Sequence, residues 1–271
     1  ITFLRPACRF VPCSAPFFVW FVASSHLPAG LTWFLCFFVV KFDPLAAFAP
    51  ALFSMLNPAH TSKRDTYYNR ERPSLVRLVA AGPNLILDLG CGSGAVGRRL
   101  LRDGKAAALV GVELFPAAAT EAAQAYQAIH TGDIEVMHLP YENHFDYVLC
   151  GDILEHLKDP YSVVRRIHGW LKPEGRLICS VPNIRHWQVL ADLAVRGAWD
   201  YQDAGIMDRT HLRFFTRRSC FKMLADAGFA VQECQLFIGG RKFQFLNRIT
   251  LSCFDEFFGS QIVTLDRKKM P

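Results

Sequence analysis

The sequence predicts an α/β domain in which helices cover both faces of a mostly parallel sheet. Between residues 85 and 181, short apolar segments alternate with segments that have helical spacing. A glycine-rich turn joins the first apolar segment to the first helical one. Strands that alternate with helices form βαβ units, and right-handed crossovers then place helices on both faces of the sheet. The expected architecture is therefore a three-layer α/β/α sandwich.

The expected elements follow one another in a regular order. Strands are expected where short apolar runs end in turn residues, at 85–89, 107–112, 134–138, 145–150, 176–181, 229–237 and 261–266. Helices are expected from the spacing of apolar residues at 74–81, 96–103, 116–129, 160–171, 184–195 and 216–227. Thr216 is the expected N-cap of the last helix, and Gly228 ends it. Residues 197–213 are expected to form a loop, and residues 239–259 show no clear pattern.

The first 54 residues differ in composition from the rest of the chain. They contain only four charged residues, and residues 17–40 contain none. That stretch is long enough to cross a bilayer, which needs about 20 apolar residues, although Pro28 and Gly30 interrupt its centre. A wrong start, a membrane anchor and a signal peptide are the three interpretations. In each of them, residues 1–54 are a leader and residues 55–271 form the domain.

The net charge and the cysteine spacing give no indication of a nucleic-acid-binding protein or of a zinc site built from cysteines. The net charge of +6 over 271 residues is too small to indicate nucleic-acid binding by itself. The nine cysteines form neither a C-x-x-C pair nor a cluster with zinc spacing. Cys150 and Cys179 lie in apolar runs and are expected to be buried thiols. Free thiols in a core are typical of a reducing compartment, so a cytoplasmic location is expected, with membrane association only if residues 17–40 act as an anchor.

The turn at residues 88–97 predicts a nucleotide-like binding site. Its glycines permit positive φ and a close approach of the backbone to a ligand, and the following helix offers unpaired N–H groups. Gly92, Gly94 and Gly97 match the G-x-G-x-x-G pattern of dinucleotide-binding proteins. Asp88 argues against a dinucleotide, because a carboxylate repels a pyrophosphate and attracts a cation.

The longer string DLGCGSG at residues 88–94 resembles motif I of the class I S-adenosylmethionine-dependent methyltransferases. The resemblance implies a Rossmann-like fold with a mostly parallel seven-stranded sheet whose last strand is antiparallel. It implies S-adenosylmethionine as the cofactor, with Asp88 near its amino-acid part and with Gly90, Cys91, Gly92 and Gly94 in the loop around it. A NAD-dependent oxidoreductase and a non-catalytic S-adenosylmethionine-binding protein are the alternatives.

Acidic residues at two further positions favour a nucleoside ligand. Glu113 ends the second expected strand, 19 positions after Gly94, where a carboxylate can accept hydrogen bonds from both ribose hydroxyls; Leu114 follows it. The resemblance implies that Asp133 accepts a hydrogen bond from the adenine amine and that Ile134 packs on the adenine ring.

Residues 145–157 resemble motif IV of the same family. The resemblance implies that the strand end from Cys150 to Asp152 faces the sulfonium of the cofactor. Glu155-His156 and residues 171–177 resemble the ubiquinone-pathway O-methyltransferase group, and Tyr67-Tyr68 resembles its entry helix. The implied reaction is methyl transfer to a small-molecule acceptor, with oxygen as the favoured target.

Two histidines are candidate general bases for a hydroxyl acceptor, which usually must lose its proton. His156 follows motif IV. His211 lies in residues 208–216, which resemble a stretch of bacterial methyltransferases found among cell-envelope glycan enzymes. For both, the alternative is a role in holding the loop. Arg209 and Arg213 could recognise an anionic acceptor, such as a glycan or lipid precursor. No carboxylate cluster with metal spacing accompanies motif IV, so no metal is expected.

Overall fold

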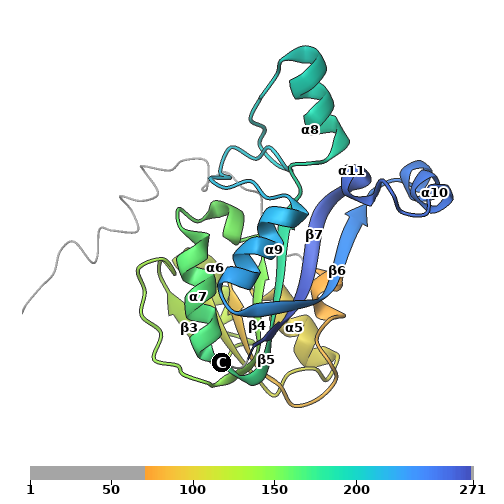
Figure 1. Ribbon diagram of the computed structural model, residues 1–271. Coiled ribbons are helices and arrows are strands. Elements are labelled where there is room, and N and C mark those ends of the chain that lie inside the picture. The colour runs from red at the N-terminus through yellow and green to blue at the C-terminus, as the bar shows by residue number, and fades with distance from the viewer. Residues whose placement is uncertain (1–70, 270–271) are drawn as a thin grey trace, which may run out of the picture. The chain divides into compact units, whose positions relative to one another are not determined.

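The computed structural model describes residues 71–269 (Figure 1). The predicted leader at 1–54 and the Tyr67-Tyr68 pair lie outside these residues. Within them, no helix combines the length and the apolar composition that crossing a membrane requires.

A seven-stranded sheet forms the centre of the described domain, with the strand order β3-β2-β1-β4-β5-β7-β6. β7 pairs antiparallel with both β5 and β6, and the other pairs are parallel. The predicted sheet, mostly parallel with an antiparallel last strand, is thereby confirmed. The strands are β1 (Leu85–Leu89), β2 (Ala108–Glu113), β3 (Ala128–Thr131), β4 (Phe145–Gly151), β5 (Leu171–Pro182), β6 (Phe229–Ile238) and β7 (Gly259–Lys268).

Helices cover both faces of this sheet, as predicted. On one face, α4, α5 and the segment after α6 contribute Leu75, Leu100 and Tyr126 to a buried cluster. On the other face, α7 and α9 pack side by side in front of the strands (Figure 1). The helices are α4 (Pro73–Val76), α5 (Ala95–Arg102), α6 (Pro116–Ala122), α7 (Pro160–Trp170), α8 (Trp187–Ala191), α9 (Arg217–Asp226), α10 (Arg241–Ile249) and α11 (Asp255–Phe258), with the 3-10 turn η1 (Leu154–His156) and the π-helical turn η2 (Asp192–Arg196).

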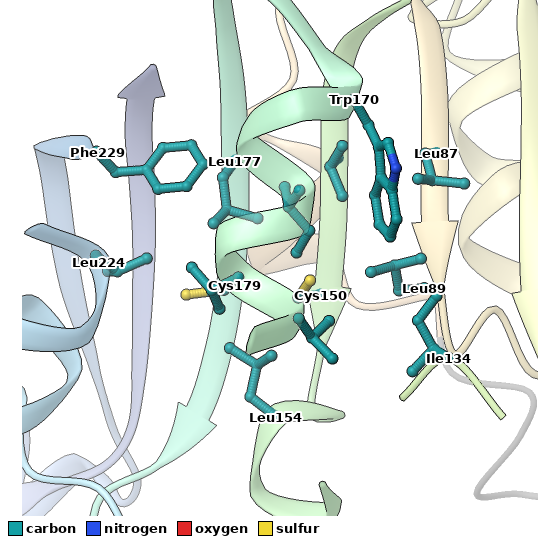
Figure 2. Close-up of a cluster of buried hydrophobic side chains, with 14 of the residues drawn as sticks. Leu87, Leu89, Ile134, Cys150, Leu154, Trp170, Leu177, Cys179, Leu224 and Phe229 are labelled. Carbon is teal, nitrogen blue, oxygen red and sulfur yellow. The ribbon is translucent and has the colours of Figure 1, made fainter. Parts of the chain in front are cut away.

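The larger buried cluster lies between α7, α9 and the central strands. Figure 2 shows Trp170 of α7 beside Leu87 and Leu89 of β1, while Leu224 of α9 lies on the side of Cys179. A large apolar side chain of this kind stabilises the fold by about 1.5–3 kcal/mol when it is fully buried. This packing fixes the strand ends that carry the site.

Side-chain caps define where the helices on this face begin. The Asp159 side chain accepts a hydrogen bond from the Ser162 amide at 3.1 Å at the start of α7. Thr216 and Ser219 form a reciprocal capping box at the start of α9, so the predicted N-cap at Thr216 is confirmed. Gly228, with φ of 87°, follows the end of that helix, in the left-handed region that glycine adopts without strain.

One predicted strand was wrong, and two helices were missed. The strand expected at 134–138 lies instead at Ala128–Thr131, because α6 ends at Ala122 rather than at residue 129. Residues 134–137 form a turn in which the carbonyl of Asp133 accepts bonds from two later amides. The alanine-rich run has high helix propensity, but pairing with β2 and burial of Tyr126 outweigh it. The segment without a clear pattern, 239–259, contains α10 and α11.

Candidate active site

A pocket of about 260 Å³ lies beyond the carboxyl ends of β1, β2 and β4. The strand order reverses between β1 and β4, and ligands of open α/β sheets bind at such a switch point. Its lining combines acidic, glycine and apolar residues: Arg72, Leu75, Asp88, Gly90, Cys91, Gly92, Val96, Val112, Glu113, Leu114, Phe115, Gly132, Asp133, Ile134, Glu135, Gly151, Asp152, Ile153, His156, Leu157, Lys158, Arg209, Thr210 and Leu212.

The glycine loop contributes backbone rather than side chains to this pocket. Gly90 and Gly92 have φ of 67° and 56°, so both need the freedom of glycine. The amides of Gly90 and Cys91 donate to the carbonyl of Val112 at 2.8 and 3.1 Å, which joins the loop to β2. Gly94 does not line the pocket; a Cβ there would lie 3.0 Å from the backbone of Ala122. Gly94, the second glycine of the G-x-G-x-x-G pattern, therefore permits close packing of α5 on α6.

Asp88 lies at the end of β1 with its side chain 4% exposed. Its Oδ2 accepts a hydrogen bond from the Tyr126 hydroxyl at 2.5 Å. Burial raises the pKa of Asp88 to about 6, although the Tyr126 hydroxyl and the charge of Arg72 oppose the rise. A cation in the pocket would stabilise the ionised carboxylate and lower this pKa.

Glu113 joins the end of β2 to the glycine loop. Its carboxylate accepts hydrogen bonds from the amide of Gly92 at 2.8 Å and from that of Phe115 at 3.0 Å. Burial raises the pKa of Glu113, and these backbone bonds oppose the rise. Each carboxylate oxygen keeps room for a second hydrogen bond. Leu114 follows it in the pocket wall.

Asp133 and Ile134 form the side of the pocket beyond β3. One oxygen of Asp133 accepts a hydrogen bond from the Glu135 amide at 2.8 Å, which orders the turn. Ile134 is 4% exposed and belongs to the buried cluster. The two residues thus place a polar and an apolar surface side by side, as recognition of a heteroaromatic ring requires.

The end of β4 places Asp152, but not Cys150, at the pocket. Asp152 forms an ion pair with Arg72 and accepts hydrogen bonds from the Ser180 hydroxyl at 2.6 Å and the Gln261 amide at 2.5 Å. Burial would raise the pKa of Asp152, but the charge of Arg72 and these bonds outweigh it, so the pKa lies below its ordinary value. The Cys150 side chain is fully buried in the core and does not line the pocket (Figure 2), which corrects the prediction that it faces the cofactor. Cys150 still lies within β4, where its side chain packs into the buried cluster, whereas Asp152 lies just beyond the end of the strand.

Sequence reasoning missed the role of Arg72 in this site. Arg72 immediately precedes α4, and its ion-pair partner Asp152 is 80 residues away in the chain. The only signal available was a cationic residue just before a helix that starts with proline. That signal does not identify an ion-pair partner across the sheet.

The two candidate bases come together with Glu155. The rings of His156 and His211 lie edge to face with their centroids 4.8 Å apart. One ligand atom each of Glu155, His156 and His211 lies within 4.8 Å of the other two. His156 lines the pocket, whereas His211 is buried and does not line it. The predicted pair is thus brought together, with one ring facing the pocket.

Backbone hydrogen bonds tie residues 208–213 to η1. The amides of Leu212 and Arg213 donate to the carbonyl of Glu155 at 2.8 and 3.0 Å. Arg209 lines the pocket and forms an ion pair with Asp203 at 2.7 Å. The guanidinium of Arg213 donates instead to the carbonyl of Lys158. Of the two predicted anion-binding arginines, only Arg209 lies at the pocket.

The residues present fit S-adenosylmethionine. Buried carboxylates at Asp88 and Glu113 suit a cationic amino acid and a ribose diol. Gly90 and Gly92 line the pocket without side chains, and Ile134 offers an apolar face. A pyrophosphate would meet these two carboxylates at close range. When bound, S-adenosylmethionine supplies an electrophilic methyl group.

The chain is similar in sequence to known methyltransferases. Residues 62–233 match a family described as a methyltransferase domain. The chain is 29% identical over 199 residues to the ubiquinone biosynthesis O-methyltransferase of Ruegeria pomeroyi. This alignment covers 69% of this chain and 74% of that protein. It is 30% identical to the protein of the same name from Psychrobacter cryohalolentis, with coverages of 66% and 71%.

Solved structures share the fold at low sequence identity. An S-adenosylmethionine-dependent methyltransferase from Mesorhizobium loti aligns with a TM-score of 0.54 and 20% identity, over 73% of this chain and 97% of that one. The 1,6-didemethyltoxoflavin-N1-methyltransferase of Burkholderia thailandensis, solved with S-adenosylhomocysteine, aligns with a TM-score of 0.53 and 18% identity, over 90% and 94%. The chain belongs to the methyltransferase domain family and is a class I S-adenosylmethionine-dependent methyltransferase.

Proposed function

We propose that this enzyme methylates a hydroxyl group of a small-molecule acceptor. The observation that carries the proposal is the position of His156 in the pocket wall, with its Nδ1 3.2 Å from the carbonyl of Thr210. A carbonyl only accepts hydrogen bonds, so this nitrogen is the donor and the lone pair of the neutral ring is on Nε2. A histidine in that form can accept the proton that a hydroxyl loses.

The cofactor-binding residues follow from the pocket lining. Asp88 would bind the ammonium of the cofactor, and Glu113 the ribose hydroxyls, with the backbone of Gly90, Cys91 and Gly92 lying along the ligand. Leu114, Asp133 and Ile134 would surround the adenine. Asp152, held by Arg72 and Ser180, would lie toward the sulfonium and the acceptor. Gly94 and Cys150 support this site from outside the pocket lining.

His211 is assigned a supporting role beside His156. Its Nδ1 lies 2.9 Å from the carbonyl of Ile206, so it too carries its lone pair on Nε2 when neutral. Its ring packs edge to face on that of His156. The chain's own contribution is then to align the acceptor, exclude water and remove one proton, because displacement at a sulfonium chiefly needs orientation.

An anionic glycan or lipid precursor is the proposed class of acceptor. Arg209 at the pocket rim is half exposed and can pair with a phosphate or carboxylate. The names of the ubiquinone biosynthesis relatives favour oxygen as the target. Buried free thiols at Cys91, Cys150 and Cys179 favour a cytoplasmic location. Residues 55–271 are the proposed catalytic domain, and residues 1–54 are the proposed leader.

Labelled cofactor tests this proposal directly. The full chain is incubated with S-adenosylmethionine carrying a labelled methyl group and with fractionated polar and lipid extracts of bacterial cells. We expect a labelled methyl ether, identified by mass spectrometry and NMR. His156→Gln should lower its rate of formation by about 100-fold or more, with little change in S-adenosylhomocysteine affinity measured by calorimetry. The exposed His138→Gln is the control. Labelled N-methyl or C-methyl products alone would reject oxygen as the target.

A further inference from the structure

We propose that Glu155, His156 and His211 form a binding site for a divalent transition-metal cation, with zinc as its best fit. One ligand atom of each side chain lies within 4.8 Å of those of the other two. Two imidazoles and one carboxylate are ligands that zinc accepts, and a site with three protein ligands keeps one position open. The expectation of no metal considered only carboxylates near motif IV. The fold adds His211, 55 residues after His156 in the chain.

The second ring nitrogens support the site. Nδ1 of His156 contacts the carbonyl of Thr210 at 3.2 Å, and Nδ1 of His211 contacts that of Ile206 at 2.9 Å. Because carbonyls only accept, both rings carry hydrogen on Nδ1 and offer Nε2 as the ligand. Histidine ligands of metal sites typically donate their other N–H to a backbone carbonyl or carboxylate. The same arrangement occurs here on both rings, on two different backbone carbonyls.

The surrounding contacts hold these rings in place. The Thr210 hydroxyl lies 2.7 Å from Asp208 and donates to its carboxylate, so it faces Nδ1 of His156 as an acceptor at 3.1 Å. Asp208, Thr210 and His211 are 3%, 6% and 7% exposed. A second shell that is buried and hydrogen-bonded fixes ligand orientation before a cation arrives.

A cation would draw these atoms slightly closer. Tetrahedral zinc with bonds of about 2.1 Å to nitrogen or oxygen places its ligands roughly 3.4 Å apart. Closing from the observed limit of 4.8 Å to this spacing requires the ligand atoms to approach one another by up to about 1.4 Å. Hard cations that prefer oxygen ligands are disfavoured, because imidazole suits zinc, copper, iron and nickel better than magnesium or calcium.

The metal site deepens the proposed function. Only the effect of the cation on methyl transfer rests on that proposed function. His156 lies in the pocket wall, so the open position of the cation would face the acceptor. A cation there lowers the pKa of an oxygen ligand: the acceptor O–H bond breaks and its proton passes to solvent water. When the cation is bound, it promotes loss of the acceptor hydroxyl proton, which is the role proposed above for Nε2 of His156 in the metal-free enzyme. Binding of the cation itself needs neither cofactor nor acceptor.

Cobalt provides the test, because Co²⁺ at a zinc-type site has visible absorption. The full chain is freed of metal with a chelator, titrated with Co²⁺ and then with Zn²⁺ as competitor. We expect one Co²⁺ per chain, with visible bands that Zn²⁺ abolishes. His156→Gln, His211→Gln and Glu155→Gln should each weaken Zn²⁺ binding by more than the roughly 10–100-fold that follows from loss of an outer-shell partner. His138→Gln is the matched control.

Two results would overturn the site: no stoichiometric Co²⁺ binding by the wild type, or unchanged spectrum and affinity in the variants. His156 is only partly buried, so His156→Gln and the wild-type titration decide the matter even if His211→Gln does not fold. A failed titration leaves the proposed O-methylation intact, since the labelled-product assay measures that separately. Loss of methyl ether formation in the presence of a zinc chelator, restored by Zn²⁺, would show that the cation serves the reaction.

Discussion

Replacing Asp88 by asparagine should stabilise the protein and weaken its cofactor binding at the same time. Burial raises the pKa of this carboxyl from the ordinary value of 3.8 to about 6. Each pKa unit is worth about 1.4 kcal/mol, so the ionised group destabilises the ligand-free fold by about 3 kcal/mol at pH 7.5. Asparagine keeps an acceptor for the Tyr126 hydroxyl, but its amide N–H groups lose hydration. The net gain should therefore be about 1–2 kcal/mol.

The two effects are measured separately. Urea unfolding at pH 7.5 should give a higher free energy of unfolding for Asp88→Asn, and thermal unfolding a rise of a few degrees. Calorimetry should show S-adenosylhomocysteine bound at least about 10-fold more weakly, because a charged hydrogen bond worth about 1.5–3 kcal/mol is lost. Asp226→Asn, at an exposed position on α9 where the carboxylate pairs with Lys222, should leave the affinity unchanged and alter the free energy of unfolding by no more than about 0.5 kcal/mol. A destabilised Asp88→Asn, or one with undiminished affinity, would refute this account of the residue.

Further predictions concern four other positions in the domain. Glu113→Gln should weaken S-adenosylhomocysteine binding in calorimetry, because the carboxylate that Gly92 and Phe115 donate to loses its charge. Burial raises the pKa of Asp266 to about 7, so its proton stabilises the fold at low pH, and this stability is lost as the pH rises through 7. Urea unfolding should show this loss from about pH 4, near the ordinary pKa of an aspartate, up to about pH 7, with little further change above pH 7. Asp266→Asn should remove the share of the loss that belongs to Asp266 and leave the share that belongs to Asp88. Gly97→Ala places a Cβ 2.4 Å from the Tyr126 ring and should lower the free energy of unfolding by about 1–3 kcal/mol. Gly169→Ala, with open space around it in α7, should raise it by about 0.5–1 kcal/mol.

Much of the fold could be predicted because local patterns and tertiary structure agree along most of the sheet. The strand at 85–89 and the capped helix that begins after Thr216 were predicted closely, since apolar runs and side-chain caps act over a few residues. The strand at Ala128–Thr131 was not, because its residues are half buried and follow an alanine-rich run. Only pairing with β2 makes that segment extended, and pairing between distant segments leaves no local pattern.

The site shows the same division between local and distant information. Asp88 and Glu113 lie near the ends of the neighbouring strands β1 and β2, and their strand positions predicted this. Asp133 follows β3, although the sequence placed it before an expected strand at 134–138, and only the family resemblance implied its role. Cys150 precedes a strand end in the same way, but its side chain points into the core. The pairing of Arg72 with Asp152 and the meeting of His156 with His211 depend on how distant segments fold back over the sheet. Neither juxtaposition has a signature in the spacing of residues.

The backbone bonds from Leu212 and Arg213 to the carbonyl of Glu155 have a consequence for the release of the two products. Leu212 and Thr210 line the cofactor pocket while belonging to the segment assigned to the acceptor. Any shift of that segment on acceptor binding therefore changes the wall that the cofactor touches. Thermodynamic reciprocity then requires each ligand to alter the affinity of the other by the same factor. S-adenosylhomocysteine that stays bound would hold the acceptor segment in place, so release of the two products should be cooperative rather than independent.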